Sequence, residues 1–180
     1  MLGGNLLKYE DILNKVYKGD LSKVPDRLLC LDPGETTGWC LFEKGKLTKW
    51  GQSPTFNKVE ECIDWKEVRQ LFSSTNPSHV VCENYRVYAH KLERHSFSEV
   101  PTIRIIGGIE LLCYDGIEDK WTADGNWYHI PLHYQMATQA KGFVSDDKLK
   151  EWGFYQPGMK HSRDAIRHGL YYLIITNKPK

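Results

Sequence analysis

The alternation of apolar runs with polar, glycine- and proline-containing breaks predicts an α/β domain. Short apolar runs with the length and composition of β-strands lie at residues 27–31, 37–42, 79–82 and 127–132. A Lys44-Gly45 turn introduces one more strand, at residues 46–51. Apolar positions at near-helical spacing predict helices over residues 5–18, 57–72, 102–114, 146–152 and 162–176.

This order of elements predicts a five-stranded mixed sheet flanked by helices. The first three strands are expected to form an antiparallel meander, and the first, fourth and fifth to run parallel. At 180 residues the chain is too short for two full-sized domains. We therefore expect a helical N-terminal extension, residues 1–26, followed by a single domain, residues 27–180.

Nothing in the chain predicts a membrane or secretory protein. No apolar run approaches the roughly 18 to 20 residues that a bilayer span needs, and Leu6-Leu7 is followed at once by charged residues. The five cysteines are odd in number and contain no Cys-x-x-Cys pair, which is typical of buried free thiols rather than disulfides or a zinc site. The expected location is the cytoplasm.

Two acidic residues occupy positions where open α/β sheets bind ligands. Asp32 and Glu83 each stand at the carboxyl end of an apolar strand. If these strands are neighbours, the two side chains lie about one strand spacing apart, roughly 5 Å. Carboxylates this close repel one another, and a divalent cation would compensate them. Taken alone, each residue could equally be a turn former or a helix cap.

The last predicted helix supplies two more candidate ligands. His161 and Asp164 are three residues apart and therefore share one face of that helix, on a polar stripe that continues to His168 and Tyr171. Three carboxylates and one histidine suit Mg²⁺ or Mn²⁺ better than zinc. Two such ions could activate water for phosphodiester cleavage.

Three motifs, in this order, resemble the RuvC family of Holliday junction resolvases. They are Leu29-Cys30-Leu31-Asp32-Pro33-Gly34 followed by Thr37-Gly38, Val80-Val81-Cys82-Glu83, and His161-Ser162-Arg163-Asp164-Ala165. The resemblance spans roughly residues 27–174. It implies a ribonuclease H-like fold and a homodimeric, Mg²⁺- or Mn²⁺-dependent endonuclease, with two ions in each active site, that cuts branched DNA.

The resemblance also implies roles for individual residues. Asp32, Glu83 and Asp164 would be carboxylate ligands, and His161 a ligand or a positioner of water. Lys141 resembles the family lysine that contacts the scissile phosphate. Residues 1–26 and the segment from Tyr85 to Val100 depart from the bacterial pattern, and small divergent members of this kind suggest a bacteriophage origin.

The charge distribution predicts a local DNA-binding surface. The net charge is only +1, but residues 141–180 carry eight basic and four acidic residues. Candidate phosphate contacts in this part are Lys141, Lys148, Lys160, Arg163 and Arg167. A second cluster follows Glu83, in which tyrosines could stack on unpaired bases: Tyr85, Arg86, Tyr88, His90, Lys91 and Arg94.

The helix at residues 102–114 is apolar almost all round and is the candidate dimer interface, although burial in the core explains it equally well. Two glycines in its middle, Gly107 and Gly108, require close packing to offset their cost, about 1 kcal/mol each.

Two other functions remain open from the sequence alone. One is an ATPase of the actin or sugar-kinase type, because the phosphate loop of that class also begins with Asp-x-Gly and threonines; the chain is short for its usual two lobes. The other is a non-catalytic module that binds branched DNA. An exonuclease of the DEDD type is disfavoured, because Gly34 stands two residues after Asp32 where that class has an acid.

Overall fold

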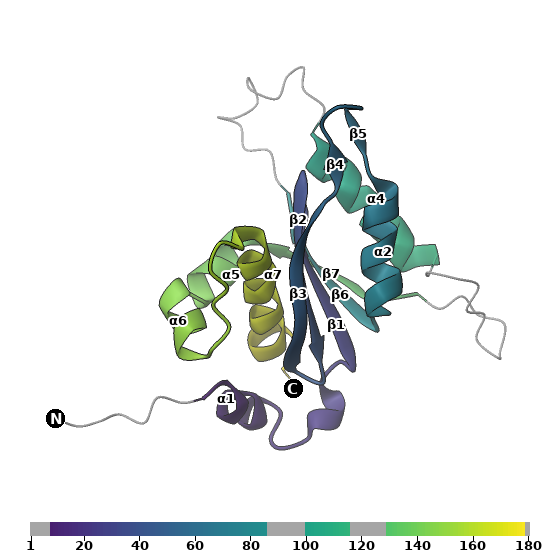
Figure 1. Ribbon diagram of the computed structural model, residues 1–180. Helices are drawn as coiled ribbons and strands as arrows, with labels where there is room; N and C mark the ends of the chain where they lie inside the picture. Colours follow the sequence, from purple (N-terminus) through teal and green to yellow (C-terminus); the bar gives the residue numbers. More distant parts are fainter. Residues whose placement is uncertain (1–7, 86–99, 116–128, 179–180) are drawn as a thin grey trace, which may run out of the picture.

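The computed structural model describes residues 8–85, 100–115 and 129–178. Its centre is a five-stranded sheet in the order β3-β2-β1-β6-β7 (Figure 1). The strands are β1 (Arg27–Asp32), β2 (Thr36–Glu43), β3 (Lys46–Pro54), β6 (His79–Asn84) and β7 (Leu132–Met136). The helices are α1 (Tyr9–Val16), α2 (Trp65–Thr75), α4 (Pro101–Asp115), α5 (Ala137–Phe143), α6 (Asp146–Glu151) and α7 (Lys160–Tyr171).

The predicted mixture of strand directions is confirmed. Strand β2 pairs antiparallel with both β1 and β3, whereas β6 pairs parallel with β1 and β7. Strand β1 is thus central, and residues 28–32 are buried. A strand that is covered on both faces has a continuous apolar sequence. The position of β1 could therefore be predicted from the sequence.

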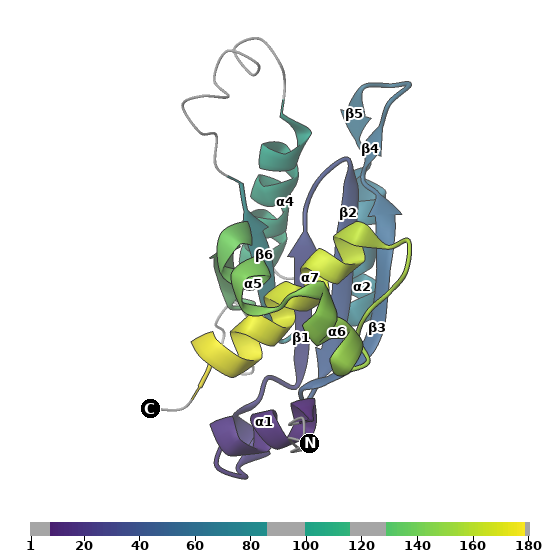
Figure 2. The same ribbon diagram turned by 90° about the vertical axis from the view of Figure 1, so that its left-hand side faces the viewer.

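Helices cover the two faces of the sheet in separate layers. Figures 1 and 2 show α5 and α7 on one face and α2 and α4 on the other. Alternate residues of β1 enter different cores: Cys30 packs with Leu170 of α7, and Leu31 packs with Ile105 of α4. Since side chains alternate along a strand, Asp32 faces the α7 layer, as Cys30 does.

The helix predicted over residues 57–72 is wrong in its first half. Residues 56–63 form a small hairpin of β4 (Phe56–Asn57) and β5 (Cys62–Ile63). The side chain of Asn57 accepts hydrogen bonds from the backbone N–H groups of Val59 and Glu60, and Glu61 has a left-handed φ of 50°. Val59, expected on a buried stripe, is 92% exposed.

Helix α2 begins only after Asp64, whose side chain accepts hydrogen bonds from the N–H groups of Lys66 and Glu67. This is an N-cap in the usual sense, since it satisfies donors that lack a partner within the helix. The cap therefore sets the helix start, and the apolar residues before it belong to the hairpin.

The strand predicted over residues 127–132 lies further along the chain. Residues 127 and 128 fall outside the described part, and β7 begins at Leu132 and pairs with β6 from Val80 to Asn84. Its residues His133 and Gln135 are polar but face the α7 layer, where Gln135 is buried. Because the residues on this covered face are polar, the hydrophobic pattern does not predict a strand here.

Helix α1 packs into the same core as α7. Leu13 and Tyr17 are buried there, and the Tyr17 hydroxyl donates a hydrogen bond of 3.0 Å to the carbonyl of Leu173. The hydroxyl of Tyr9 donates to the carbonyl of Gly45 at 2.8 Å. Leu173 lies in a short π-helical turn, Tyr172–Thr176, that continues α7.

Helix α4 is apolar on two sides with different surroundings. Ile105, Ile109 and Cys113 are buried against the sheet. Gly108 lies against the ring of Trp65, and a Cβ at this position would come within 2.1 Å of that ring, whereas Gly107 faces open space. The close packing expected at both glycines is therefore present at Gly108 and absent at Gly107.

All five cysteines are free, and four of them are buried. Within the described ranges, no helix combines the length and the apolar character needed to cross a bilayer.

Candidate active site

Three polar side chains form a row across the parallel strands. Leu31 of β1 pairs with Cys82 of β6, so the next residues, Asp32 and Glu83, lie side by side. Glu83 in turn pairs with Gln135 of β7. All three face the layer of α7 because side chains alternate along each strand. The expected proximity of Asp32 and Glu83 therefore follows from the strand register.

Helix α7 lies over this row. His161, Asp164 and His168 share one face of the helix through their i, i+3, i+7 spacing. Asp164 and His168 are buried, so this part of the polar stripe predicted on the helix faces the sheet. The backbone N–H of His161 donates to Oε1 of Gln52 on β3 at 3.0 Å, which fixes the start of the helix beside the sheet.

Two histidines of α7 contact the two strand-end acids. Nδ1 of His161 lies 2.9 Å from Oδ2 of Asp32. Nε2 of His168 lies 2.8 Å from Oε2 of Glu83, and Nδ1 of the same ring lies 2.9 Å from Oε1 of Gln135. Each acid of the sheet thus has a partner on the helix.

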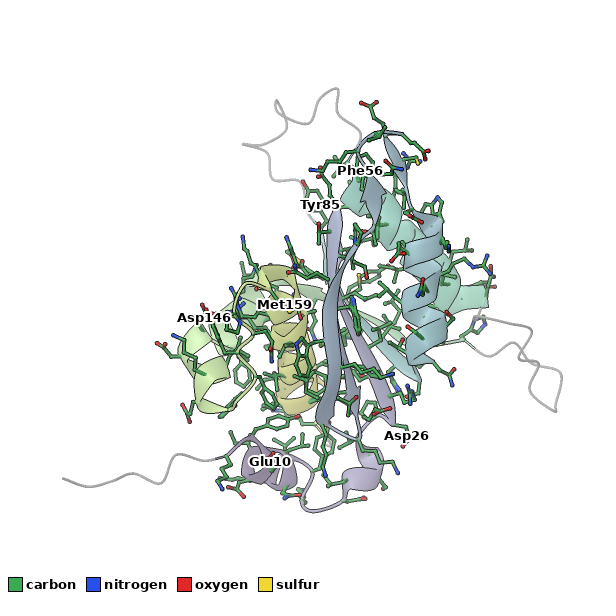
Figure 3. The ribbon with its side chains drawn as sticks, viewed as in Figure 1. Glu10, Asp26, Phe56, Tyr85, Asp146 and Met159 are labelled. Carbon is green, nitrogen blue, oxygen red and sulfur yellow. The ribbon has the colours of Figure 1, made fainter. Side chains whose placement is uncertain are left out.

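Asp164 is held by two cations. Nζ of Lys141, from α5, lies 3.1 Å from its Oδ2, and the guanidinium of Arg167 binds its Oδ1. The same guanidinium also binds Asp146 at the start of α6 and donates to the carbonyl of Val144. Figure 3 shows Asp146 on the α7 side of the sheet.

The electrostatics of the site disfavour the ionised form of Asp32. Burial, together with the charges of Glu83 and Asp164, raises the pKa of Asp32 from 3.8 to about 6, although the hydrogen bond with His161 opposes the shift. Burial would lower the pKa of Lys141, but its hydrogen bond to Asp164 and the surrounding acids raise it. Glu83 and Asp164 are therefore close enough to Asp32 to oppose its ionisation.

The donor set suits a hard divalent cation. It consists of three carboxylates and one imidazole, in a site where Glu83 and Asp164 oppose the ionisation of Asp32. Oxygen-rich sets of this kind bind Mg²⁺ or Mn²⁺. In the described part of the chain, no three His, Cys, Asp or Glu side chains already stand together at ligand distance. Each acid contacts a histidine, a lysine or an arginine at this position.

The fold has counterparts among solved structures. The RuvC protein of Thermus thermophilus in complex with a Holliday junction substrate has a TM-score of 0.56 and 14% identity, covering 83% of this chain and 94% of that one. A second Thermus thermophilus RuvC structure gives 0.54 and 14%, with coverage of 83% and 95%. The chain has a RuvC-like fold.

The yeast mitochondrial Holliday junction resolvase is similar to this RuvC-like chain as well. Its TM-score is 0.52 at 11% identity, covering 95% of this chain and 87% of that one. No protein-family model matches the sequence, and no curated protein sequence matches it. The likeness to RuvC is thus one of three-dimensional structure, and it confirms the ribonuclease H-like architecture expected from the motifs.

The predicted DNA contacts on α5, α6 and α7 differ in their exposure and in their protein partners. Lys160, at the start of α7, is exposed, and the side chain of Lys141 is half-exposed beside Asp164. Lys148 lies over the rings of Phe143 and Trp152, and Arg163 donates to the carbonyl of Gln156.

Arg167 is buried, unlike the other described residues among the predicted DNA contacts. It is only 9% exposed, and its guanidinium is occupied by Asp164, Asp146 and the carbonyl of Val144. It therefore joins α7 to α6 and to the residues between α5 and α6. Its contact with phosphates stays a prediction.

The second predicted cluster is described only at its first residue. Tyr85 follows the end of β6 and is partly buried (Figure 3). Arg86, Tyr88, His90, Lys91 and Arg94 lie outside the described residues, so their part in DNA binding stays a prediction.

Two residues of the site were not identified as functional from the sequence. The sequence marks His168 only as part of the polar stripe of the last helix. It gives no signal for Gln135, because the strand predicted there ends at residue 132. The available signal was the spacing: His168 stands seven residues after His161 and so lies two turns along the same helix face.

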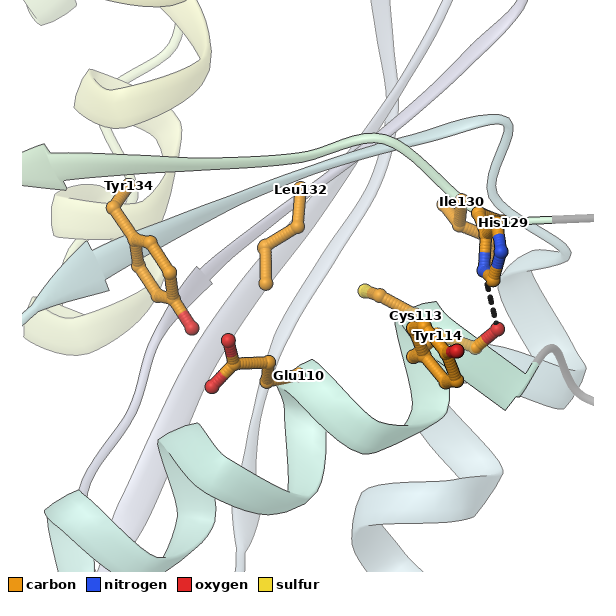
Figure 4. A pocket seen from close by; sticks show the side chains of 7 residues that line it. All are labelled: Glu110, Cys113, Tyr114, His129, Ile130, Leu132 and Tyr134. Carbon is orange, nitrogen blue, oxygen red and sulfur yellow. Dashed lines mark hydrogen bonds between the residues drawn. The ribbon is translucent and has the colours of Figure 1, made fainter.

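A separate apolar pocket of about 250 Å³ lies between α4 and β7, on the opposite face of the sheet. Figure 4 shows Glu110 and Tyr134 pointing toward one another across it. Burial and the adjacent Glu110 raise the pKa of the Tyr134 hydroxyl to about 12. The pocket shares none of the residues that surround Asp32.

Proposed function

We propose that this protein is a divalent-metal-dependent endonuclease that hydrolyses phosphodiester bonds in branched DNA, including four-way junctions. The observation that carries the proposal is the group of three acids, buried Asp32 and Asp164 with partly buried Glu83, within a RuvC-like fold. The raised pKa of Asp32, about 6, supports it, because burial next to two other carboxylates is costly for the ionised form. A structural role alone gives no reason to gather three acids here.

Asp32, Glu83, Asp164 and His161 are the residues that would hold Mg²⁺ or Mn²⁺, with two ions in each site. When bound, the ions would lower the pKa of water and stabilise the leaving oxygen of the phosphodiester. His161 orients Asp32 through the 2.9 Å contact. Lys141, whose side chain is 47% exposed and lies beside Asp164, is positioned to bind a phosphate oxygen at the rim of the site.

The DNA backbone would approach the site along the N-terminal end of α7. Lys160 is exposed there, one residue before His161. Tyr85 leads from Glu83 into the segment that carries Arg86, Tyr88, His90, Lys91 and Arg94, which would contact the branch.

We also propose that the protein acts as a homodimer through the outer face of α4. Ile103, Leu111 and Tyr114 are 49%, 58% and 65% exposed on this helix, and the open space beside Gly107 lies on the same helix. Several exposed apolar residues on one helix are typical of an interaction surface. A two-fold dimer would present two sites to two strands of a junction.

The test is cleavage of a synthetic four-way junction, labelled on each strand in turn, with Mg²⁺ or Mn²⁺. The wild-type protein should nick the junction and leave a linear duplex of the same sequence intact. Asp32→Asn and Glu83→Gln should each reduce cleavage by more than roughly 100-fold, beyond the usual effect of residues that only support a ligand.

Asp147→Asn is the matched control, because Asp147 is a carboxylate on the exposed surface of α6 whose side chain is 93% exposed. It should leave cleavage unchanged. Equal cleavage by wild type and Asp32→Asn, with no contaminating nuclease, would rule out the proposed site.

A further inference from the structure

His168 is the most completely enclosed ionisable side chain of the site. The residue is fully buried, yet both ring nitrogens have a partner: Glu83 at 2.8 Å on Nε2 and Gln135 at 2.9 Å on Nδ1. A buried imidazole held at both nitrogens has a fixed ring plane. It touches neither Asp32 nor the exposed rim, so its effect on the site passes through Glu83.

The position of this ring follows from the fold. Glu83 and Gln135 are paired residues of neighbouring parallel strands, and α7 crosses above them. About one turn earlier on α7, Asp164 faces the same group of acids. His168 therefore bridges β6 and β7 at the inner end of the site, where solvent does not reach.

The contact engages one oxygen of Glu83. When Glu83 is ionised it carries no hydrogen, so Nε2 of the imidazole donates to Oε2. Nδ1 of the neutral ring is then an acceptor, and the side-chain amide of Gln135, whose buried Nε2 has no other partner, can donate to it when its NH₂ group is turned toward the ring. Within the described ranges, no contact to Oε1 is seen, and the side chain of Glu83 is 20% exposed. The carboxylate is thus held from the buried side while its other oxygen can face the site.

We infer that His168 is a positioning residue that fixes the carboxylate of Glu83 for cation binding, with Gln135 fixing the ring of His168 in turn. Partners that orient a ligating carboxylate in this way affect metal affinity by about 10- to 100-fold. The inference rests on the proposed function, because it assigns Glu83 to the metal site. It adds two residues, His168 and Gln135, that do not contact the substrate or the ion.

The test measures Mn²⁺ binding directly, by electron paramagnetic resonance of free Mn²⁺ during titration of the full-length protein without DNA. His168→Leu removes the donor and should weaken Mn²⁺ binding roughly 10-fold. His168→Gln keeps an amide donor at about the reach of Nε2 and should restore most of the affinity. Cleavage of the junction should show a lower kcat with an unchanged KM for His168→Leu.

Ile166→Ala separates positioning from stability. Ile166 is fully buried on the same helix and belongs to the core between α7 and the sheet, so its truncation should lower the melting temperature and leave Mn²⁺ affinity unchanged. His168→Asn serves if the leucine variant does not fold, because the shorter amide cannot reach Glu83 and should bind Mn²⁺ as weakly as expected for leucine.

The outcomes separate the two proposals. Mn²⁺ affinities that are equal in the wild type and in His168→Leu or His168→Asn would overturn the inference and leave the proposed function standing. A wild-type protein that binds no Mn²⁺ would overturn both. Weak binding in the leucine and asparagine variants with recovery in His168→Gln supports the positioning role.

Discussion

Nδ1 of His161 lies 2.9 Å from Oδ2 of Asp32, although 129 residues separate them in the chain. The contact joins the first turn of α7 to the carboxyl end of β1. Gly38, the residue of β2 that pairs with Asp32, makes the approach of the helix possible. A Cβ at this position would lie 2.1 Å from the backbone carbonyl of His161, far inside any real contact.

Gly38→Ala should therefore displace the start of α7. Overpacking of this kind costs about 1 to 3 kcal/mol. Because the neighbour is the backbone of His161, we expect a loss of free energy of unfolding at the upper end of that range, with loss of junction cleavage. Gly34→Ala is the control, because its Cβ would meet only the carbonyl oxygen of Thr36 at 3.4 Å. Urea unfolding of both variants checks this, and equal stability would contradict the close contact.

The raised pKa of Asp32 predicts a pH-dependent stability in metal-free buffer. The folded protein binds this proton more tightly than the unfolded chain, because the pKa is about 6 when folded against 3.8 otherwise. Its contribution to stability is therefore complete below about pH 4 and is lost as the pH rises through 6. Asp32→Asn, which cannot ionise, should be more stable than wild type at pH 8 by on the order of 2 kcal/mol.

The difference between Asp32→Asn and wild type should shrink as the pH is lowered toward 4. Thermal unfolding in the presence of a chelator, at several pH values between 4 and 8, measures it. A variant that is less stable than wild type at pH 8 would show that the hydrogen bond with His161 outweighs the repulsion from Glu83 and Asp164.

The parts of the fold that the sequence predicted well are those set by local hydrophobicity. The run that ends at Asp32 could be placed because β1 is buried on both faces, and the proximity of Asp32 and Glu83 followed from parallel strands that end together. The start of α2 could not be placed, because the apolar residues before Asp64 continue the helical spacing while the side chains of Asn57 and Asp64 bind backbone N–H groups and set the hairpin and the helix cap.

The parts of the site that were missed are polar groups whose burial depends on tertiary contacts. Gln135 looks like a surface residue until β7 is aligned with β6, and His168 looks solvent-facing until α7 is placed over the sheet. The burial of Arg167 could not be predicted for the same reason, since its partners Asp146 and Val144 lie on or beside another element. The local sequence pattern does not predict which charged side chains will have a partner in the protein interior.

The N-terminal helix should be necessary for stability. Leu13 is buried in the core that α7 forms with the sheet, and the replacement of such a leucine by alanine typically costs about 2 to 5 kcal/mol. Leu13→Ala should lower the free energy of unfolding by an amount in this range. Lys15→Ala, on the exposed side of α1, should change it by less than about 0.5 kcal/mol, and a similar effect of both variants would argue against this docking of α1.

Arg167 should act on stability rather than through DNA contact. Arg167→Met leaves Asp164 and Asp146 without their buried partner, and the loss of one member of such a pair costs about 3 to 5 kcal/mol. We expect a large decrease in the free energy of unfolding by urea. A variant as stable as wild type that loses only DNA affinity would return Arg167 to the DNA-binding surface.

Lys160, unlike Arg167, should affect DNA binding and not stability. Its side chain is exposed beside the site, so Lys160→Ala should leave the melting temperature unchanged. Its affinity for a four-way junction should fall, and the slope of log affinity against log salt should decrease by about 1 if one phosphate contact is lost. Fluorescence anisotropy at several salt concentrations measures both quantities, and an unchanged slope would place the DNA elsewhere.

The central claim is that Asp32, Glu83, His161 and Asp164 form one metal site. A crystal structure of the full-length protein soaked in Mn²⁺, with anomalous diffraction recorded at the manganese edge, tests it most directly. We expect anomalous density between Asp32, Glu83 and the N-terminal turns of α7, with Asp164 exchanging its contact with Lys141 for the ion. Manganese bound elsewhere, with His161 and Lys141 still paired to Asp32 and Asp164, would contradict the claim.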